Sequence, residues 1–483
     1  MDYFTIKPTE ENIEESLVKD LLGRNRELAK FIEILDNANQ NLTLSLNGGW
    51  GSGKTFFVKQ AVLLLNHSNA IYRNQNQINE NDPVLTKWNN MIALQTAKQI
   101  KTNHYAVYYD AWENDNSLDP VLSVLYQITL QLCNKYELDQ YKNVQKLIEE
   151  IIDYGAKEEG ISDINIPTTK ISLKKIPFAA IKKLFEHSNI VESEENRVTL
   201  KNKIKEFFDS LRIERSDRIE IFIDELDRCR PTFAVSLLER IKHYFDIDNI
   251  TFVFSTNLIE LGKTIECYYG SGFSYTRYFD KFFDLRLELN KPKSLDSFLN
   301  TIQYNRHFAA EVYCIYFSEK LGLELREIVN YLKTVRITLT QYIGGIGIRD
   351  DYYVVFGVIT PLLIGLKMFN LPVFNSIIDG SNEETFAKYL SSMNVSEASA
   401  FYDKLLNNSE YYVGNHKTGS IEVTHESKLR ELYRILFPIT QYNANGLKTK
   451  RLGNLSITYE IVNEMLSACT LLSGYSMIEQ MKK

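Results

Sequence analysis

Cysteines are few and scattered in this sequence of 483 residues. The five cysteines are odd in number and none belongs to a CxxC pair, so neither a disulfide framework nor a zinc site is predicted. The seven histidines show no metal-ligand spacing. We therefore expect a reducing compartment, the cytoplasm.

An excess of positive charge is also missing. The chain has 55 Lys and Arg against 62 Asp and Glu, a formal net charge of −7. This balance argues against broad, charge-driven binding to nucleic acid. The basic stretch of Lys448, Lys450 and Arg451 leaves a local nucleic-acid contact open, although a solvated loop is the favoured interpretation.

The sequence lacks an apolar run long enough to cross a bilayer. Its longest, Tyr352–Leu366, contains Thr360 and Pro361 and falls short of the ~20 residues that a spanning helix needs. We expect a buried core helix in a soluble protein with no transmembrane segment. The residues Met1–Pro8 do not combine a basic stretch with an apolar core, so no signal peptide is predicted.

Short apolar runs alternate with helical patterns over the first part of the chain. A chain of this length exceeds one hydrophobic core, so two or three domains are expected. The alternation predicts an α/β fold with a mostly parallel sheet and helices on both faces. The expected parts are a lead-in helix within 1–40, a core over 41–293, and an all-α C-terminal domain over 294–483. Within the core, strands are expected at 42–46, 105–109, 219–223, 250–255 and 283–289.

A glycine-rich loop follows the first strand. Residues Gly48–Thr55 fit the pattern G-x-x-x-x-G-K-[ST], between a strand and a helix as the chemistry of this motif requires. Its backbone N–H groups can surround phosphate oxygens, and the helix dipole adds to that anion site. Lys54 can reach the β- and γ-phosphates, and the Thr55 hydroxyl can bind Mg²⁺. The predicted nucleotide-binding residues are Gly48, Gly49, Trp50, Gly51, Ser52, Gly53, Lys54, Thr55 and Phe56.

A second motif predicts hydrolysis rather than binding alone. The apolar strand Ile219–Ile223 ends in Asp224 and Glu225. Asp224 is predicted to hold Mg²⁺, and Glu225 to polarise the attacking water as general base. The sequence thus describes a P-loop NTPase core.

The two motifs are 170 residues apart, which indicates a helical insertion around 135–215. Within it, the segment 170–187 combines lysines with apolar residues. Contact with a membrane surface or a partner is possible for such a segment. Docking on its own domain is the favoured interpretation.

The chain resembles the KAP family of P-loop NTPases. Asp224–Pro231 is similar to the extended Walker B signature D-[DE]-L-D-R-C-x-P, and Tyr109–Trp112 is similar to the F-N-A-W segment with Asp in place of Asn. Tyr278–Phe283 is similar to the segment before the last core strand, and the resemblance covers about residues 15–295. It implies an ATPase that uses ATP and Mg²⁺ as a conformational or assembly switch.

The resemblance also implies a bacterial source, a role in anti-phage defence, and self-association or a protein partner from a neighbouring gene. ATP is chosen over GTP because of the resemblance, since no N-K-x-D motif stands in the expected place. Two other functions stay open: a non-catalytic, nucleotide-gated scaffold and a P-loop phosphotransferase.

The fourth strand ends in Asn257, where an aspartate is more usual in the family. Its amide could orient the hydrolytic water as a sensor, or the residue could simply form a strand-ending turn. For Arg228, a clamp on Asp227 is favoured over a catalytic finger reaching across a subunit interface. Arg277 and Arg336 are further candidates for such a finger or sensor, although a surface position is favoured for each.

Two tryptophans stand near the motifs. Trp50 is expected to pack over the P-loop or against a neighbouring element, with stacking on adenine the less favoured role. Trp112 is expected to be a core anchor that positions Asp110 and Glu113.

Overall fold

The computed structural model describes residues 7–38, 40–116, 120–135, 194–244, 247–292, 295–302, 304–393, 395–406, 425–437, 449–452 and 455–470. The chain divides into two compact units, residues 6–298 and residues 299–483, which we call the P-loop unit and the helical unit. Most of the predicted insertion, including the segment 170–187, lies outside the described residues. The last part of the insertion forms helix α9 (Glu194–Arg215).

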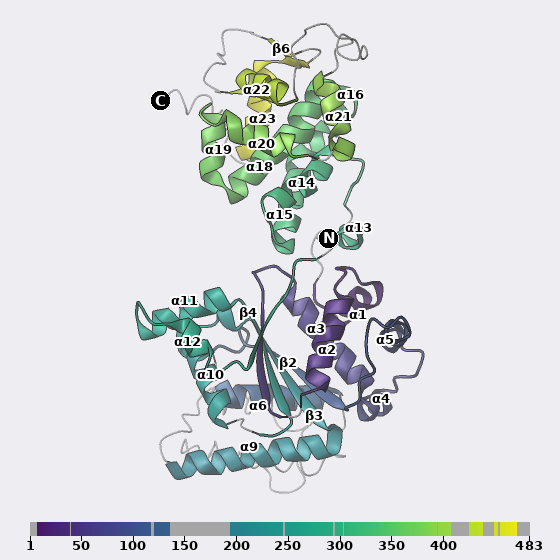
Figure 1. The fold of residues 1–483 in the computed structure, drawn as a ribbon, viewed down its shortest axis with the longest axis vertical. Helices are drawn as coiled ribbons and strands as arrows, with labels where there is room; N and C mark the ends of the chain where they lie inside the picture. Colours follow the sequence, from purple (N-terminus) through teal and green to yellow (C-terminus); the bar gives the residue numbers. More distant parts are fainter. Residues whose placement is uncertain are drawn as a thin grey trace. The chain divides into compact units, whose positions relative to one another are not determined.

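A five-stranded parallel sheet lies at the centre of the P-loop unit (Figure 1), with strand order β2-β3-β4-β1-β5. Each pair of neighbouring strands is parallel, which confirms the predicted α/β class. The strands are β1 (Leu42–Asn47), β2 (His104–Asp110), β3 (Arg218–Asp224), β4 (Ile250–Thr256) and β5 (Leu285–Glu288).

The helices of the P-loop unit cover both faces of this sheet (Figure 1). They are α1 (Glu10–Lys19), α2 (Asn25–Asp36), α3 (Lys54–Ser68), α4 (Ala70–Asn76), α5 (Pro83–Ala93), α6 (Pro120–Lys135), α9, α10 (Pro231–Tyr244), α11 (Leu258–Tyr269) and α12 (Tyr275–Phe279), with α13 (Asp296–Thr301) across the division between the units.

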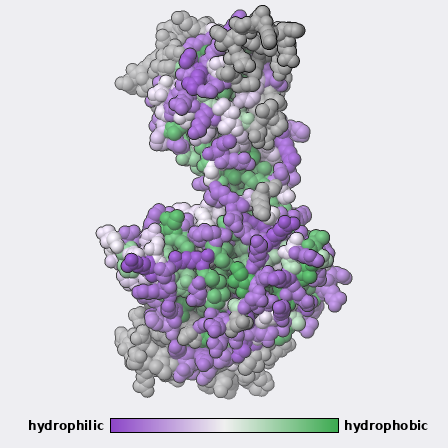
Figure 2. Space-filling model, in the orientation of Figure 1, coloured by the Kyte–Doolittle hydropathy of each residue, from purple (hydrophilic) through white to green (hydrophobic). Residues whose placement is uncertain are grey.

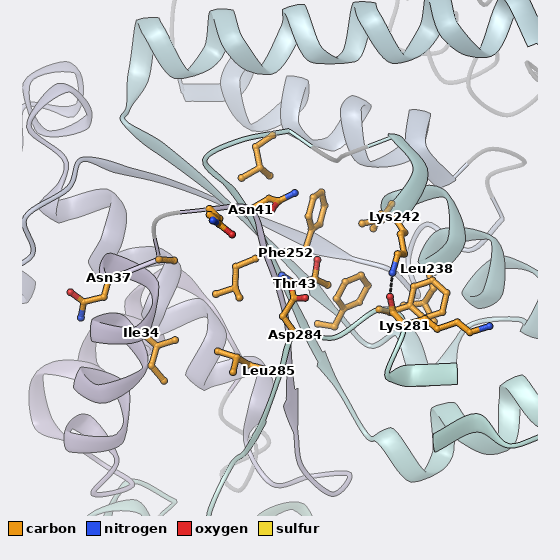
Figure 3. A pocket seen from close by; sticks show the side chains of 17 residues that line it. Ile34, Asn37, Asn41, Thr43, Leu238, Lys242, Phe252, Lys281, Asp284 and Leu285 are labelled. Carbon is orange, nitrogen blue, oxygen red and sulfur yellow. Dashed lines mark hydrogen bonds between the residues drawn. The ribbon is translucent and has the colours of Figure 1, made fainter. Parts of the chain in front are cut away.

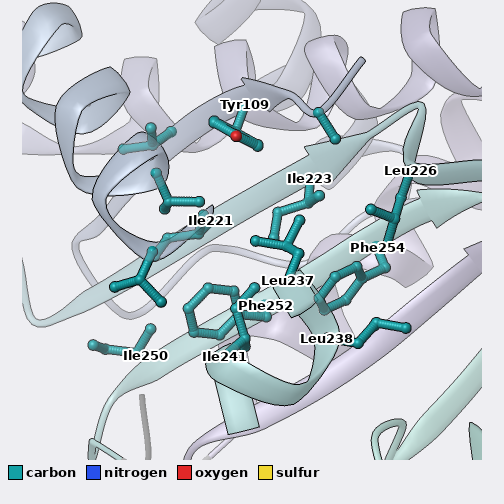
Figure 4. Packing of buried hydrophobic residues seen from close by; sticks show 14 of the residues in the cluster. Tyr109, Ile221, Ile223, Leu226, Leu237, Leu238, Ile241, Ile250, Phe252 and Phe254 are labelled. Carbon is teal, nitrogen blue, oxygen red and sulfur yellow. The ribbon is translucent and has the colours of Figure 1, made fainter. Parts of the chain in front are cut away.

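Two hydrophobic clusters hold the helices on the sheet. On one face, Phe31 of α2 and Phe57 of α3 lie in a buried cluster with Leu44 of β1. On the other face, Leu237 of α10 belongs to a cluster with Phe252 of β4 (Figure 4). All seven positions of β3 and of β4 are buried, as expected for central strands that are covered on both faces. The charged residues Arg218, Glu220 and Asp224 of β3 are buried as well.

The strand register places the predicted site at one edge of the sheet. Asp224, the last residue of β3, pairs in register with Asp110 of β2 and Ser255 of β4. Asn47, the last residue of β1, pairs with Thr256 of β4. The P-loop, which follows Asn47, and Asp224 therefore share the carboxyl edge of the sheet, where ligands bind in open α/β sheets.

The helical unit contains a long apolar helix. The expectation that no apolar stretch is long enough to cross a membrane is wrong, because the continuous segment Asp350–Phe369 is long and apolar enough by length and composition. However, 72% of its most apolar window is buried inside the protein. Its middle, Tyr353–Ile359, forms a π-helix between α17 (Asp350–Tyr352) and α18 (Thr360–Phe369). The burial of Val354, Phe356 and Leu362 confirms the predicted core helix.

The other helices of this unit are α14 (Ala309–Lys320), α15 (Leu325–Leu339), α16 (Ile343–Ile348), α19 (Leu371–Ile378), α20 (Glu383–Ser391), α21 (Val395–Leu406), α22 (His425–Leu436) and α23 (Tyr459–Thr470). A short antiparallel pair, β6 (Lys450–Leu452) and β7 (Leu455–Ile457), accompanies them. The prediction that Lys450 and Arg451 belong to a loop is therefore wrong, because both are in β6; Lys448 lies outside the described residues.

Candidate nucleotide-binding site

The P-loop connects β1 to α3 and owes its shape to glycines. Gly51 and Gly53 have φ angles of 82° and 91°, in the left-handed region that favours glycine. Gly48 is also restricted, because an added Cβ would lie 2.8 Å from the Ser52 hydroxyl. These residues let the chain turn closely enough for several backbone amides to face one anion.

Lys54 is the first residue of α3, and its ammonium group lies within the loop. Its Nζ donates to the carbonyl oxygens of Gly48 (2.6 Å) and Gly49 (3.1 Å), and the residue is buried. Burial lowers the pKa of Lys54, against the opposing negative charges of Asp227 and Asp224. The loop therefore holds a fixed positive charge beside its backbone amides, as a phosphate site requires.

Thr55 and Asp224 meet as the sequence predicts. The Thr55 hydroxyl donates to Asp224 Oδ2 at 2.7 Å, and Phe56 follows in the same first turn of α3. Asp224 is buried, which raises the pKa of its carboxyl group. A hydroxyl and a carboxylate oxygen are hard ligands that suit Mg²⁺. Among the residues described, no group of three His, Cys, Asp or Glu forms a metal site, and a P-loop magnesium site does not need one.

Tyr108 is a site residue that the sequence analysis missed. Its hydroxyl donates to the same oxygen, Asp224 Oδ2, at 3.1 Å. Tyr108 precedes Asp110 by two positions, and Asp110 is in register with Asp224. Side chains alternate between the two faces of a strand, so Tyr108, Asp110 and Asp224 share one face. This alternation along the strand is the feature of the sequence that could have indicated Tyr108 as a site residue.

Glu225 occupies an unusual backbone position directly after β3. Its φ of 61° lies in the left-handed region, which is uncommon for a residue with a side chain. Burial, followed by the negative charge of Asp224, raises the pKa of Glu225 to about 7, while Arg228 opposes the rise. Near neutral pH, this carboxylate can therefore both accept and release a proton.

The expected clamp between Arg228 and Asp227 is wrong. Arg228 Nε lies 2.5 Å from Glu225 Oε2 instead. Asp227 accepts from the Thr256 hydroxyl (2.9 Å) and from the indole N–H of Trp50, which places Trp50 against a neighbouring element. The short 3₁₀ turn Leu226–Arg228 explains why Arg228 pairs with Glu225 and not with Asp227, because the turn brings positions 225 and 228 together.

Trp112 is not the core anchor that was expected, since 52% of the residue is exposed. Its ring contacts Arg228, whose guanidinium carbon lies 5.4 Å from the ring centroid. Asp110 is positioned locally instead, because its Oδ1 accepts from the backbone N–H of Glu113 at 3.1 Å. Large size predicts burial only when the backbone turns the ring inward, and the turn after β2 does not.

Asn257 begins α11 as its N-cap. Its side-chain oxygen accepts from the backbone N–H groups of Ile259 (3.1 Å) and Glu260 (3.3 Å). Of the two predicted roles, the structure thus shows the strand-ending turn, in which the amide oxygen of Asn257 is the acceptor. The sensor role, which would use the amide nitrogen, stays a prediction.

A comparison with protein families matches residues 24–312 to the KAP family P-loop domain. This match covers more than half of the chain. The chain belongs to the KAP family. No curated protein matches its sequence significantly. The membership identifies residues around the P-loop and Asp224 as a nucleotide-binding P-loop domain of NTPase type.

Arg24 connects the KAP P-loop to the end of the sheet, and the sequence analysis did not predict it. Its Nη1 donates to the Ser52 carbonyl at 2.8 Å, and its Nη2 donates to the Asn290 carbonyl. The residue is buried at the start of α2. A buried arginine that donates to two carbonyl groups holds the P-loop in place. Arg24 precedes Ser52 by 28 residues, so their contact could not be predicted from the sequence.

The two other candidate arginines of this KAP protein have different surroundings. Arg277 is exposed on α12. Arg336, in the helical unit, forms a bidentate ion pair with buried Glu311 at 2.5 and 2.6 Å. The guanidinium of Arg336 is thus engaged within its own unit.

A cavity of about 880 Å³ lies at the opposite, amino edge of the KAP sheet. Ile34 of α2, Thr43 of β1 and Leu238 of α10 line it, together with Leu285 of β5 (Figure 3). Figure 2 shows hydrophobic residues gathered in the middle of the visible face of this unit. Because the P-loop and Asp224 lie at the carboxyl edge, this cavity is separate from the nucleotide site.

Proposed function

We propose that this KAP protein binds ATP with Mg²⁺ and hydrolyses it. The supporting observation is the contact between Thr55 and Asp224, with Glu225 directly after Asp224. Bound Mg²⁺ would neutralise charge on the phosphates, and Thr55 and Asp224 would hold it. The backbone amides of the P-loop and Lys54 would hold the phosphate oxygens.

Glu225 would act as the general base. It would accept the proton of a water that attacks the γ-phosphorus, while the bond to the β–γ bridging oxygen breaks and ADP and phosphate form. Only the ionised carboxylate can accept that proton. With a pKa of about 7, Glu225 becomes ionised as the pH rises through neutrality, so hydrolysis should increase over the same range. The positive charge of Arg228 favours the active, ionised form.

We further propose that hydrolysis drives a conformational or assembly switch involving the helical unit. Membership of the KAP family and the presence of a second compact unit support this. The family resemblance supports a role in bacterial anti-phage defence, with self-association or a partner from a neighbouring gene. The free thiols of Cys229, Cys314 and Cys469 are compatible with a reducing compartment.

Release of inorganic phosphate from ATP, without any added acceptor, tests the proposal. The wild-type chain should release phosphate only with Mg²⁺, and Lys54→Ala should lose both ATP binding and release. Binding without release would instead support a nucleotide-gated scaffold. Transfer that needs an added acceptor would support a phosphotransferase.

A further inference from the structure

The loop Ala111–Asn116, directly after β2, packs against the Walker B residues at three points. The Ala111 N–H donates to the Asp224 carbonyl at 3.0 Å. Asp115 accepts from the backbone N–H of Arg230 at 3.2 Å. Between these two, Trp112 lies on the guanidinium of Arg228. The loop is therefore fixed on both sides of the indole, and none of its residues takes part in the proposed hydrolysis.

Trp112, Arg228 and Glu225 form a chain of contacts that ends at the proposed base. The indole contacts the guanidinium at 5.4 Å, and the guanidinium meets the carboxylate at 2.5 Å. Arg228 and Glu225 are only partly exposed, at 22% and 17% of their side chains, whereas Trp112 is 52% exposed. An indole with this exposure contributes little to a core, whereas its ring is in direct contact with the guanidinium of Arg228.

We propose that Trp112 is a positioning residue of the hydrolytic site: it holds the guanidinium of Arg228 against the carboxylate of Glu225. The proposal rests on the proposed function, in which Glu225 is the base. A long arginine side chain has many rotamers, and an ion pair near the surface fixes them weakly. The ring supplies a second contact that selects the rotamer facing Glu225.

The contact determines which charges stay beside Glu225. Asp224 and Asp227 face this carboxylate with negative charge, and Lys54 and Arg228 face it with positive charge. Of the two cations, Lys54 is fixed in the P-loop, so Arg228 is the one whose position depends on Trp112. Without the contact to Trp112, the guanidinium can leave Glu225, and the carboxylate then loses the ion pair that holds its orientation.

Substitution of Trp112 tests this chain of contacts. In Trp112→Ala, kcat for ATP at neutral pH should fall about two- to fivefold, the range of an exposed cation–π contact. KM for ATP should stay unchanged, because neither Trp112 nor Arg228 is placed on the nucleotide. Trp112→Phe, which keeps an aromatic face, should restore kcat.

Two controls separate positioning from a general structural effect. Tyr268→Ala removes an aromatic residue of α11 that is 48% exposed and whose ring packs against Tyr269 rather than Arg228, and it should keep the wild-type kcat. In an Arg228→Ala background, Trp112→Ala should have no further effect, because the residue it positions is already absent. Additive losses in that double variant, or a wild-type kcat in Trp112→Ala, would overturn the proposal.

A measurement without turnover distinguishes this proposal from the proposed function. The emission of Trp112 is obtained as the difference between the wild type and Trp112→Phe, and the same difference is taken in the Arg228→Ala background. The two difference spectra should differ, because the guanidinium lies on the ring. Identical difference spectra with and without Arg228 would reject the positioning contact. Different spectra in a protein that does not hydrolyse ATP would reject the proposed function but not the contact.

Discussion

Replacing His104 with glutamine is predicted to remove much of the pH dependence of the stability of the P-loop unit. His104 is the first residue of β2, and its side chain is fully buried. Its Nδ1 lies 2.6 Å from Glu220 Oε1, and its Nε2 lies 3.1 Å from Asp36 Oδ1. Arg218 approaches the same glutamate at 3.8 Å. The ring therefore joins β2, β3 and the end of α2 through buried charges.

The size of the effect follows from the pKa of His104. Burial alone would lower that pKa, but Glu220 and Asp36 outweigh burial and raise it from 6.5 to about 9. At 1.36 kcal/mol for each pKa unit, this rise corresponds to about 3 kcal/mol. Because the folded state has the higher pKa, the contribution is fully present below pH 6.5 and is lost as the pH rises through about 9.

Urea unfolding followed by tryptophan fluorescence measures this contribution. The three tryptophans of the chain, Trp50, Trp88 and Trp112, all lie in the P-loop unit, so the signal reports on that unit alone. Between a pH below 6.5 and a pH well above 9, the wild type should lose about 3 kcal/mol of unfolding free energy through this histidine. His104→Gln should be less stable at neutral pH, since it leaves buried Glu220 without its cationic partner, but its loss with pH should be much smaller.

His67→Gln is the matched control for this experiment. His67 also pairs with an aspartate, Asp82 at 3.0 Å, but it stands outside the His104 network. It should keep the wild-type loss of stability at alkaline pH. Parallel losses in the wild type and His104→Gln would refute the reasoning, because the charge of His104 would then contribute nothing.

Two further predictions concern residues beside the nucleotide. Tyr108→Phe removes the hydroxyl that donates to the Asp224 carboxylate. The Mg²⁺ concentration needed for half-maximal ATP hydrolysis should therefore rise about tenfold, as for other partners of metal ligands. Tyr109→Phe is the control, because the Tyr109 hydroxyl is bonded to Ser123, and it should leave the Mg²⁺ titration unchanged. Arg24→Lys loses the paired bonds of the guanidinium, so ATP binding measured by calorimetry should weaken about tenfold, the effect of losing a charged hydrogen bond. The exposed Arg26→Lys should bind ATP like the wild type, and equal binding in Arg24→Lys would exclude a role for Arg24 in shaping the loop.

The sequence could predict those parts of the site that depend on spacing along the chain. The glycines at 48, 51 and 53 define the P-loop, because few other residues permit its φ angles and close approaches. The meeting of Thr55 with Asp224 follows from a general property of parallel sheets, whose carboxyl ends lie at one edge. The order of the strands was not predictable, since it depends on how each crossover packs on the sheet.

Contacts set by local backbone geometry could not be predicted in the same way. Arg228 turns to Glu225 because Glu225 is in the left-handed region and a 3₁₀ turn follows it. No spacing rule distinguishes that partner from Asp227, which stands beside Arg228 in the sequence. Trp112 is exposed for a similar reason, because the turn after β2 directs its ring to Arg228 rather than to the core.

The central claim is that this KAP domain hydrolyses ATP with Glu225 as the base. Steady-state phosphate release and ATP binding, measured together for the wild type and Glu225→Gln, test it most directly. Glu225→Gln keeps the P-loop and Thr55–Asp224, so it should bind ATP with Mg²⁺ like the wild type, while its turnover should fall by about two to four orders of magnitude. Equal turnover in the two proteins would contradict the claim.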